Sequence, residues 1–77
     1  MEERDVISLV EEILEVDPGT VSMTDALDDI DWDSLSNISF IAEIDSRLGV
    51  SINADQLSKA ATVADLYALV QDAAQRG

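Results

Sequence analysis

The chain has 77 residues, a length that suits a thin hydrophobic core, and we expect a single domain over residues 1–77. It contains no Cys and no His, which excludes disulfides and removes the usual zinc ligands and the usual general base for a serine nucleophile. We therefore expect neither catalytic residues nor a metal site. The formal net charge of −13 disfavours nucleic acid and anionic membranes as partners and favours proteins with basic patches, although solubility alone would also explain it.

The composition and the start of the chain also bear on where the protein resides. Apolar residues make up 47% of the chain, too many for a disordered acidic tail. The initial Met-Glu-Glu-Arg-Asp is acidic and is not followed by an apolar stretch long enough for a signal peptide or a membrane span. We expect a cytoplasmic protein with no stable membrane association.

The first predicted helix lies near the amino terminus, where apolar residues recur with helical spacing over about three turns. The acidic residues of this stretch, Glu11 among them, fall largely on the opposite side. The segment Asp17-Pro18-Gly19 should end the helix, because the residue before Pro is pushed out of the helical region. The apolar positions are Val6, Ile7, Val10, Ile13 and Leu14.

Residues 20–33 show no sustained periodicity, which predicts a long loop. The segment Ser22-Met23-Thr24-Asp25 is typical of the start of a single helical turn through Ala26 and Leu27. Long ordered loops in small domains tend to carry function. The side chains expected to hold this loop against the core are Val21, Met23, Leu27 and Ile30.

The second predicted helix runs from about Ser34 to Leu48, with Gly49 as its carboxyl cap. One apolar strip has the width of a core-facing stripe and contains Phe40, Ile41, Ile44 and Leu48. A second strip, defined by Leu35, Ile38 and Ala42, is centred well over 90° away, by the roughly 100° turn per residue of a helix. Either the loop packs over this second strip or the strip docks a partner protein.

The remainder of the chain predicts a short helix and a longer one. Val50-Ser51-Ile52 forms an extended link that is too brief for a strand, and Asn53 should cap a short helix through about Lys59. The Thr62-x-x-Asp65 spacing predicts the start of the last helix. The fold class is therefore all-α. The predicted core contains Val10, Ile13, Leu14, Phe40, Ile44, Leu48, Ile52, Leu66 and Val70.

The tripeptide Asp33-Ser34-Leu35 stands where the acidic loop gives way to the second helix. Its hydroxyl lies at the positive end of a helix, where backbone N–H groups can hold an anion. An ordinary helix cap would explain a lone Ser in this place equally well. By itself the tripeptide is common, so its position in the chain carries the evidence.

Nearly the whole chain resembles the acyl carrier protein family, as a free-standing carrier domain. The resemblance rests on a first helix ending in Asp17-Pro18, the long loop, Asp33-Ser34-Leu35 opening the second helix, a Gly-Val-x-Ile exit at residues 49–52 and Thr62-Val63 opening the last helix. It implies a four-helix carrier-protein bundle with three longer helices, one short third helix and a long loop between the first two.

The resemblance also implies a cofactor and its attachment residue. Ser34 would carry 4′-phosphopantetheine, transferred from coenzyme A by a phosphopantetheinyl transferase, and would present acyl groups as thioesters. Asp33 would contribute to recognition by the transferase, and Leu35 would pack near the arm. Other implied partners are an acyl-loading enzyme and acyl-processing or acyltransferase enzymes, which supply the catalysis while the carrier stays monomeric. The implied partner surface is Leu35, Ile38, Ala42 and Asp45.

Some positions depart from the family pattern. Trp32 stands where many members have a smaller residue, and we expect it to fasten the loop to the bundle rather than to shield the arm. Ser36 and Ser39 occupy positions that are often acidic in carriers of general fatty-acid synthesis. Docking should therefore depend more on apolar contact than on charge, which favours a specialised lipid or secondary-metabolite pathway over housekeeping fatty-acid synthesis.

Three other interpretations stay open or fail on the residues. An aminoacyl or peptidyl carrier usually has Gly-rich residues around the serine, whereas this chain has Trp32-Asp33 before it. A non-carrier acidic helical adaptor would use Ser34 only as a cap. A calcium loop counted from Asp29 fails, because its required Gly is Ser34 and its required Glu is Phe40. Loose attraction of divalent cations by the acidic run is still expected.

Overall fold

The computed structural model describes residues 1–76 and the side chains of residues 1–75. These residues form four α-helices and one 3₁₀ turn. No strand occurs in the described residues, so the prediction of an all-α fold is confirmed. No helix among them is long and apolar enough to cross a bilayer. The elements are α1 (Glu3–Leu14), η1 (Leu27–Ile30), α2 (Ser34–Leu48), α3 (Ala54–Ser58) and α4 (Val63–Arg76).

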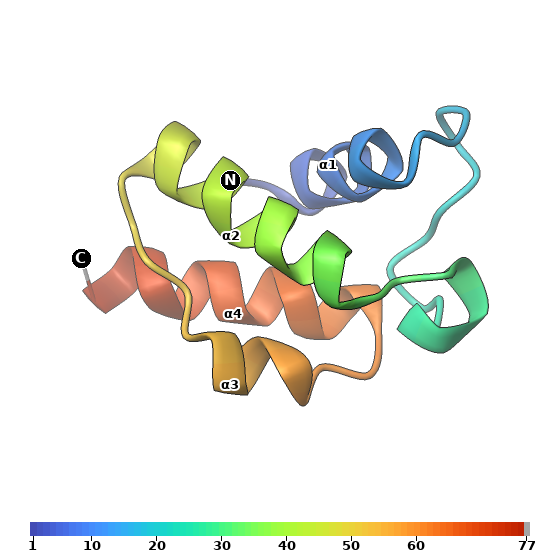
Figure 1. Ribbon diagram of the computed structural model, residues 1–77. Coiled ribbons are helices and arrows are strands. Elements are labelled where there is room, and N and C mark those ends of the chain that lie inside the picture. The colour runs from blue at the N-terminus through green and yellow to red at the C-terminus, as the bar shows by residue number, and fades with distance from the viewer. Residues whose placement is uncertain (77) are drawn as a thin grey trace.

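In Figure 1 α2 and α4 run lengthwise across the view, and the short α3 lies beside both. α1 packs against both α2 and α4. The loop between α1 and α2, which contains η1, lies at the end opposite the carboxyl terminus (Figure 1). This arrangement places the start of α2, with Ser34, beside the acidic loop.

The hydrophobic core draws side chains from all four helices and from the long loop. Leu48 is 37% exposed, so its prediction as a core residue is wrong, whereas Ile13 and Leu14 are partly buried and pack against the core. All three lie in the last turn of a helix, where the following turn that would complete their cover is missing. The core side chains are Val6, Leu9, Val10, Val21, Leu27, Phe40, Ile44, Ile52, Leu57, Val63, Leu66 and Val70.

Helix α1 ends earlier and differently than predicted. Glu15 adopts a left-handed conformation (φ 58°), and its N–H bonds back to the carbonyls of Glu11 and Glu12, which closes the helix before Pro18 is reached. Glu11 is buried rather than solvent-facing as predicted. Its Oε2 accepts the N–H groups of Gly19 at 2.8 Å and Val21 at 3.2 Å, so these bonds explain why a carboxylate tolerates burial.

The predicted helix boundaries in the second half of the chain are confirmed by their caps. Gly49, with φ 68°, ends α2, and the Asn53 side chain accepts two N–H groups of α3. At the start of α4 the Asp65 N–H bonds to Thr62 Oγ1 at 3.3 Å, and the Thr62 N–H bonds to the Asp65 carboxylate at 3.1 Å. This reciprocal pair satisfies two backbone donors at a helix start.

The long loop is fastened to the start of α4. The first N–H groups of that helix, on Val63 and Ala64, bond to the carbonyls of Asp25 at 3.1 Å and Met23 at 3.0 Å. The predicted helical turn lies later than expected, at Leu27–Ile30, because the segment from Ser22 to Asp25 forms a plain turn instead. The four loop side chains expected to hold the loop do pack against the core, Met23 and Ile30 being partly buried.

Candidate functional site

Ser34 is the first residue of α2 and is exposed. Asp33 precedes it in an extended conformation and caps the helix: its Oδ1 accepts the Ser36 N–H at 2.9 Å and the Ser36 hydroxyl at 3.1 Å. These bonds, the backbone one foremost, hold the pKa of Asp33 below its usual value. Asp33 therefore acts as the cap, and the hydroxyl of Ser34 is left at the surface.

Ser36 has a different role from the one that sequence reasoning gave it. Its side chain is buried and donates to Asp33, so it contributes little to the docking surface, whereas Ser39 is exposed. The Asp-x-x-Ser spacing at a helix start could have indicated this role of Ser36, because a capping side chain reaches the N–H of the residue three positions after it.

Trp32 fastens the end of the loop to α2. Its indole N–H donates to Asn37 Oδ1, and its ring meets Phe40 edge to face, with ring centroids 5.9 Å apart and planes at 75°. Its backbone N–H bonds to the Leu27 carbonyl at 3.1 Å. These contacts match the packing role expected for Trp32. They also close a bridge across Ser34, because Trp32 precedes the serine and Asn37 follows it.

The starts of α2 and α4 differ in how their backbone is covered. The first N–H groups of α4 are occupied by loop carbonyls, as described above. At the start of α2 both Ser34 and Leu35 are exposed, and Leu35 retains 72% of its accessible surface. An anion attached to Ser34 would therefore face the positive end of this helix from its exposed side.

The second apolar strip of α2 is at the surface. Ile38 is 63% exposed, and Ala42 and the neighbouring Asp45 are exposed as well. The interpretation that the loop packs over this strip is therefore wrong. Arg47 lies beyond the strip and pairs with Glu43 on α2 and Glu12 on α1, each at 3.1 Å, so α2 presents few unpaired charges.

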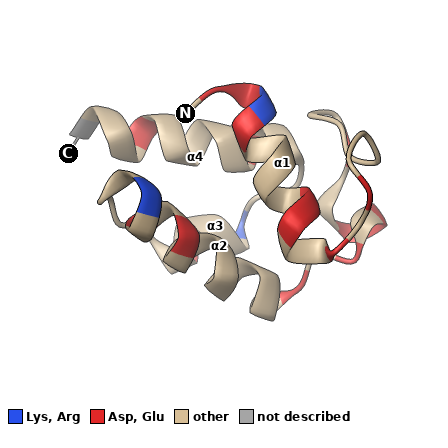
Figure 2. Ribbon diagram, turned by 90° about the horizontal axis from the view of Figure 1, so that it is seen from above, with Lys and Arg blue, Asp and Glu red and all other residues tan. Residues whose placement is uncertain are grey.

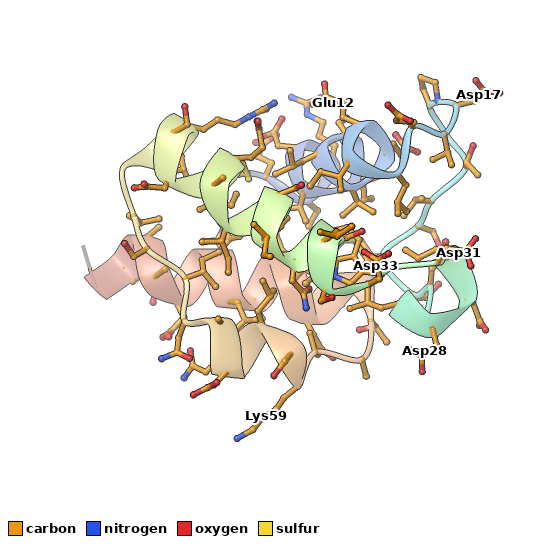
Figure 3. All side chains as sticks on the ribbon, in the orientation of Figure 1. Glu12, Asp17, Asp28, Asp31, Asp33 and Lys59 are labelled. Carbon is orange, nitrogen blue, oxygen red and sulfur yellow. The ribbon has the colours of Figure 1, made fainter. Side chains whose placement is uncertain are left out.

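Acidic side chains gather on the loop next to the serine. Figure 2 shows acidic segments but no basic one along this loop, and in Figure 3 Asp28 and Asp31 point outward from the 3₁₀ turn while Asp33 lies at the junction with α2. No three carboxylates within the described part of the chain are arranged to hold a metal ion. The loop residues concerned are Glu15, Asp17, Asp25, Asp28, Asp29, Asp31 and Asp33.

Known proteins similar to this chain share one kind of domain. A protein-family profile described as a phosphopantetheine attachment site matches residues 4–70. The chain is 31% identical over 64 residues to an acyl carrier protein of Rhodococcus erythropolis, a match that covers 82% of this chain and 70% of that relative. Its fold resembles the solution structure of the acetyl actinorhodin acyl carrier protein from Streptomyces coelicolor, with a TM-score of 0.75, 26% identity and coverage of 99% of this chain and 93% of that one. The predicted carrier-protein fold is thereby confirmed.

Proposed function

This chain belongs to the acyl carrier protein family and contains its phosphopantetheine attachment domain, and from that premise we propose that Ser34 is the attachment residue. The observation that carries the proposal is the exposed position of Ser34 at the start of α2, directly after a capping Asp33. In this proposal the arm on Ser34 carries acyl groups as thioesters. Acyl carrier proteins are carriers rather than catalysts, and they work with partner enzymes.

The attachment chemistry needs nothing from this chain beyond the hydroxyl and its position. Ser34 Oγ forms a phosphodiester, the pyrophosphate bond of coenzyme A breaks, the hydroxyl proton leaves, and adenosine bisphosphate is the leaving group. The transferase supplies the base that a chain without His lacks. The terminal thiol of the arm supplies the sulfur that a chain without Cys lacks, and tethering raises the effective concentration of the cargo at the partner's active site.

The proposed cargo is an acyl group rather than an aminoacyl or peptidyl group. Trp32-Asp33 before the serine differs from the Gly-rich surroundings of peptidyl carriers, and the structural relative is an acetyl form of an acyl carrier protein. Fatty-acid, polyketide and specialised lipid or secondary-metabolite pathways all use such cargo. Of these we favour a specialised pathway, because the exposed Ser39 occupies a position of α2 that is often acidic in carriers of general fatty-acid synthesis.

The proposed partner surface consists of Leu35, Ile38, Ala42 and Asp45. Its apolar members leave little charge for a partner to recognise, so binding should respond weakly to salt. Titration with a ketosynthase of fatty-acid synthesis at low and high salt tests this expectation. Tight binding that weakens steeply with salt would contradict it and would favour a housekeeping role.

Intact-mass measurement tests the attachment site. The purified protein is incubated with coenzyme A and a promiscuous phosphopantetheinyl transferase, and the expected product has gained one phosphopantetheine. Ser34→Ala should gain nothing, whereas Ser39→Ala, which removes another exposed serine of the same helix, should be loaded like the parent. If the parent itself stays unmodified, the chain is instead an acidic helical adaptor that uses Ser34 as a cap.

A further inference from the structure

The chain contains a single lysine, Lys59, which lies at the carboxyl end of α3. Because the chain has no Cys and no His, Lys59 is the only residue whose side chain can present an amine, a thiol or an imidazole. An acyl thioester, the cargo proposed above for the arm on Ser34, reacts with a neutral amine and gives an amide. Whether the two groups can meet depends on the exposure and the position of Lys59.

The amine of Lys59 is accessible. The residue is exposed, and in Figure 3 its side chain extends away from α3. Within residues 1–75 the ion pairs involve Arg4 and Arg47, and none involves Lys59. Lys59 borders an open depression that Ala68 and Leu69 also line. A thioester carbonyl can therefore approach the amine from solvent without displacing a buried side chain.

The same depression also contains carboxylates, of Asp65 and Asp72. The carboxylate of Asp65 accepts the N–H groups of Ala61 at 2.8 Å and Thr62 at 3.1 Å, and so it stays at the start of α4. These bonds leave Lys59 at the edge of the depression with its amine towards solvent.

Helix α3 returns along α2 towards the start of α2. The two helices are in contact and run in opposite directions (Figure 1). With a rise of 1.5 Å per residue, Ser34 lies about 21 Å from the far end of α2, and Lys59 lies about 7 Å back from that end along α3. An interaxial distance of about 8–10 Å then separates the backbones of the two residues by about 17 Å.

Hydrogen bonds connect the end of α3 to the loop that precedes Ser34. The carbonyl of Ala61, two residues after Lys59, accepts the Leu27 N–H at 2.9 Å. The carbonyl of Leu27 accepts the N–H of Trp32, two residues before Ser34, at 3.1 Å. The end of α3 and the start of α2 are therefore held at the same end of the molecule.

A phosphopantetheine arm is long enough to bridge this separation. About fifteen bonds join the serine oxygen to the thioester carbonyl, and an extended chain advances about 3.3–3.6 Å for every three bonds, which gives a reach of about 17–18 Å. The flexible side chain of Lys59 adds to this reach. Tethering by a short flexible linker gives an effective concentration of the order of 1 mM at the amine.

We propose that Lys59 is a modification site that takes the acyl group from the arm of its own chain. The inference rests on the proposed arm on Ser34. The amine nitrogen attacks the thioester carbonyl, so that a C–N bond forms and the C–S bond breaks. The proton that the nitrogen loses ends on the departing sulfur. The products are an Nε-acyl amide on Lys59 and an arm with a free thiol, which can be loaded again.

Intact-mass measurement of the octanoyl-loaded protein tests the site. A first spectrum shows whether the arm and the octanoyl group are present, so a failure of attachment at Ser34 is seen separately. The protein is then incubated in mildly alkaline buffer and treated with hydroxylamine, which cleaves thioesters but not amides. The parent should retain one octanoyl group, mapped to Lys59, and Lys59→Arg should retain none. Retention in Lys59→Arg, or none in the parent, would overturn the inference.

A mixing experiment tests whether the transfer occurs within one chain. Octanoyl-loaded Lys59→Arg serves as the donor, and Ser34→Ala, which keeps Lys59 but cannot carry an arm, serves as the acceptor. At about 10 µM of each, transfer to the acceptor should be about a hundredfold slower than transfer within the parent, because the tethered thioester is present at about 1 mM. Equal rates would show that Lys59 reacts only as an ordinary exposed amine, and the inference would then be wrong.

Discussion

The Asp33 carboxylate and Ser36 are joined twice, through the Ser36 N–H at 2.9 Å and its hydroxyl at 3.1 Å, both to the same oxygen. The pair encloses the first turn of α2 and with it Ser34, which lies between the two residues in the chain. Because Ser36 is buried, this oxygen is held in place from the core side of the helix. The residue before the attachment serine is thereby fixed while the serine itself stays exposed.

The Asp33 cap should depend on pH in the acid range. Its pKa is lowered, first by the backbone N–H of Ser36 and then by the Ser36 hydroxyl, so its contribution to stability is present above the ordinary pKa of an aspartate. That contribution is lost as pH falls through the lowered folded-state pKa. Carboxyl-detected NMR titration should give an Asp33 midpoint below 3.8. In Ser36→Ala the midpoint should rise towards 3.8, and an unchanged midpoint would show that the hydroxyl contributes nothing.

Glu11 should stabilise the fold through its acceptor oxygen more than through its charge. Glu11→Leu keeps much of the volume but leaves the N–H groups of Gly19 and Val21 without an acceptor, which should cost about 1–3 kcal/mol of unfolding free energy. Glu11→Gln retains one amide oxygen and should lose less. Urea unfolding measures both variants. Equal losses for the two would assign the effect to the negative charge.

Replacing Glu15 by Gly should stabilise the fold. A non-Gly residue in the left-handed region costs roughly 1–2 kcal/mol, and Gly avoids this cost but gives back part of it through a more flexible unfolded chain. We therefore expect Glu15→Gly to raise the unfolding free energy by about 0.5–1 kcal/mol in thermal or urea unfolding. Glu15→Gln removes the same charge without changing the backbone. If it stabilises as much as Gly does, charge repulsion rather than conformation is the cause.

The fold could be predicted from the sequence wherever local rules decide. Asn53, Thr62 and Gly49 act as the predicted caps because each bonds or turns within a few residues of its position. The end of α1 could not be predicted from Pro18, since Glu15 adopts a conformation that Glu rarely takes. The burial of Glu11 depends on a loop eight to ten residues away folding over it, which helical periodicity does not encode.

The candidate site could be predicted only where local sequence rules decide its structure. The position of Ser34 at a helix start follows from local pattern, and so does the separation of the two strips on α2. Whether the second strip of α2 is covered depends on where the loop packs. The loop bonds to the start of α4 and leaves the strip exposed. The partial exposure of Ile13 and Leu14 follows from their place in the last turn of α1, which the predicted helix end already indicated.

Trp32 and Asn37 should be coupled energetically and should affect how readily Ser34 is modified. Trp32→Phe keeps an aromatic contact with Phe40 but loses the indole donor, and Asn37→Ala removes the acceptor. A double-mutant cycle in urea should give a coupling of about 0.5–1.5 kcal/mol, the net value of one hydrogen bond. If the bridge also pre-organises the turn around Ser34, each single variant should raise the KM of the transferase for the carrier. The reason is that a turn that has become more disordered must be ordered again when the transferase docks.

Arg47→Gln, which breaks only exposed ion pairs, serves as the control and should change stability by less than about 1 kcal/mol and leave KM unaltered. A measurable coupling with unchanged KM would limit the bridge to stability, and the absence of coupling would show that the packing of Trp32 on Phe40 alone holds the loop.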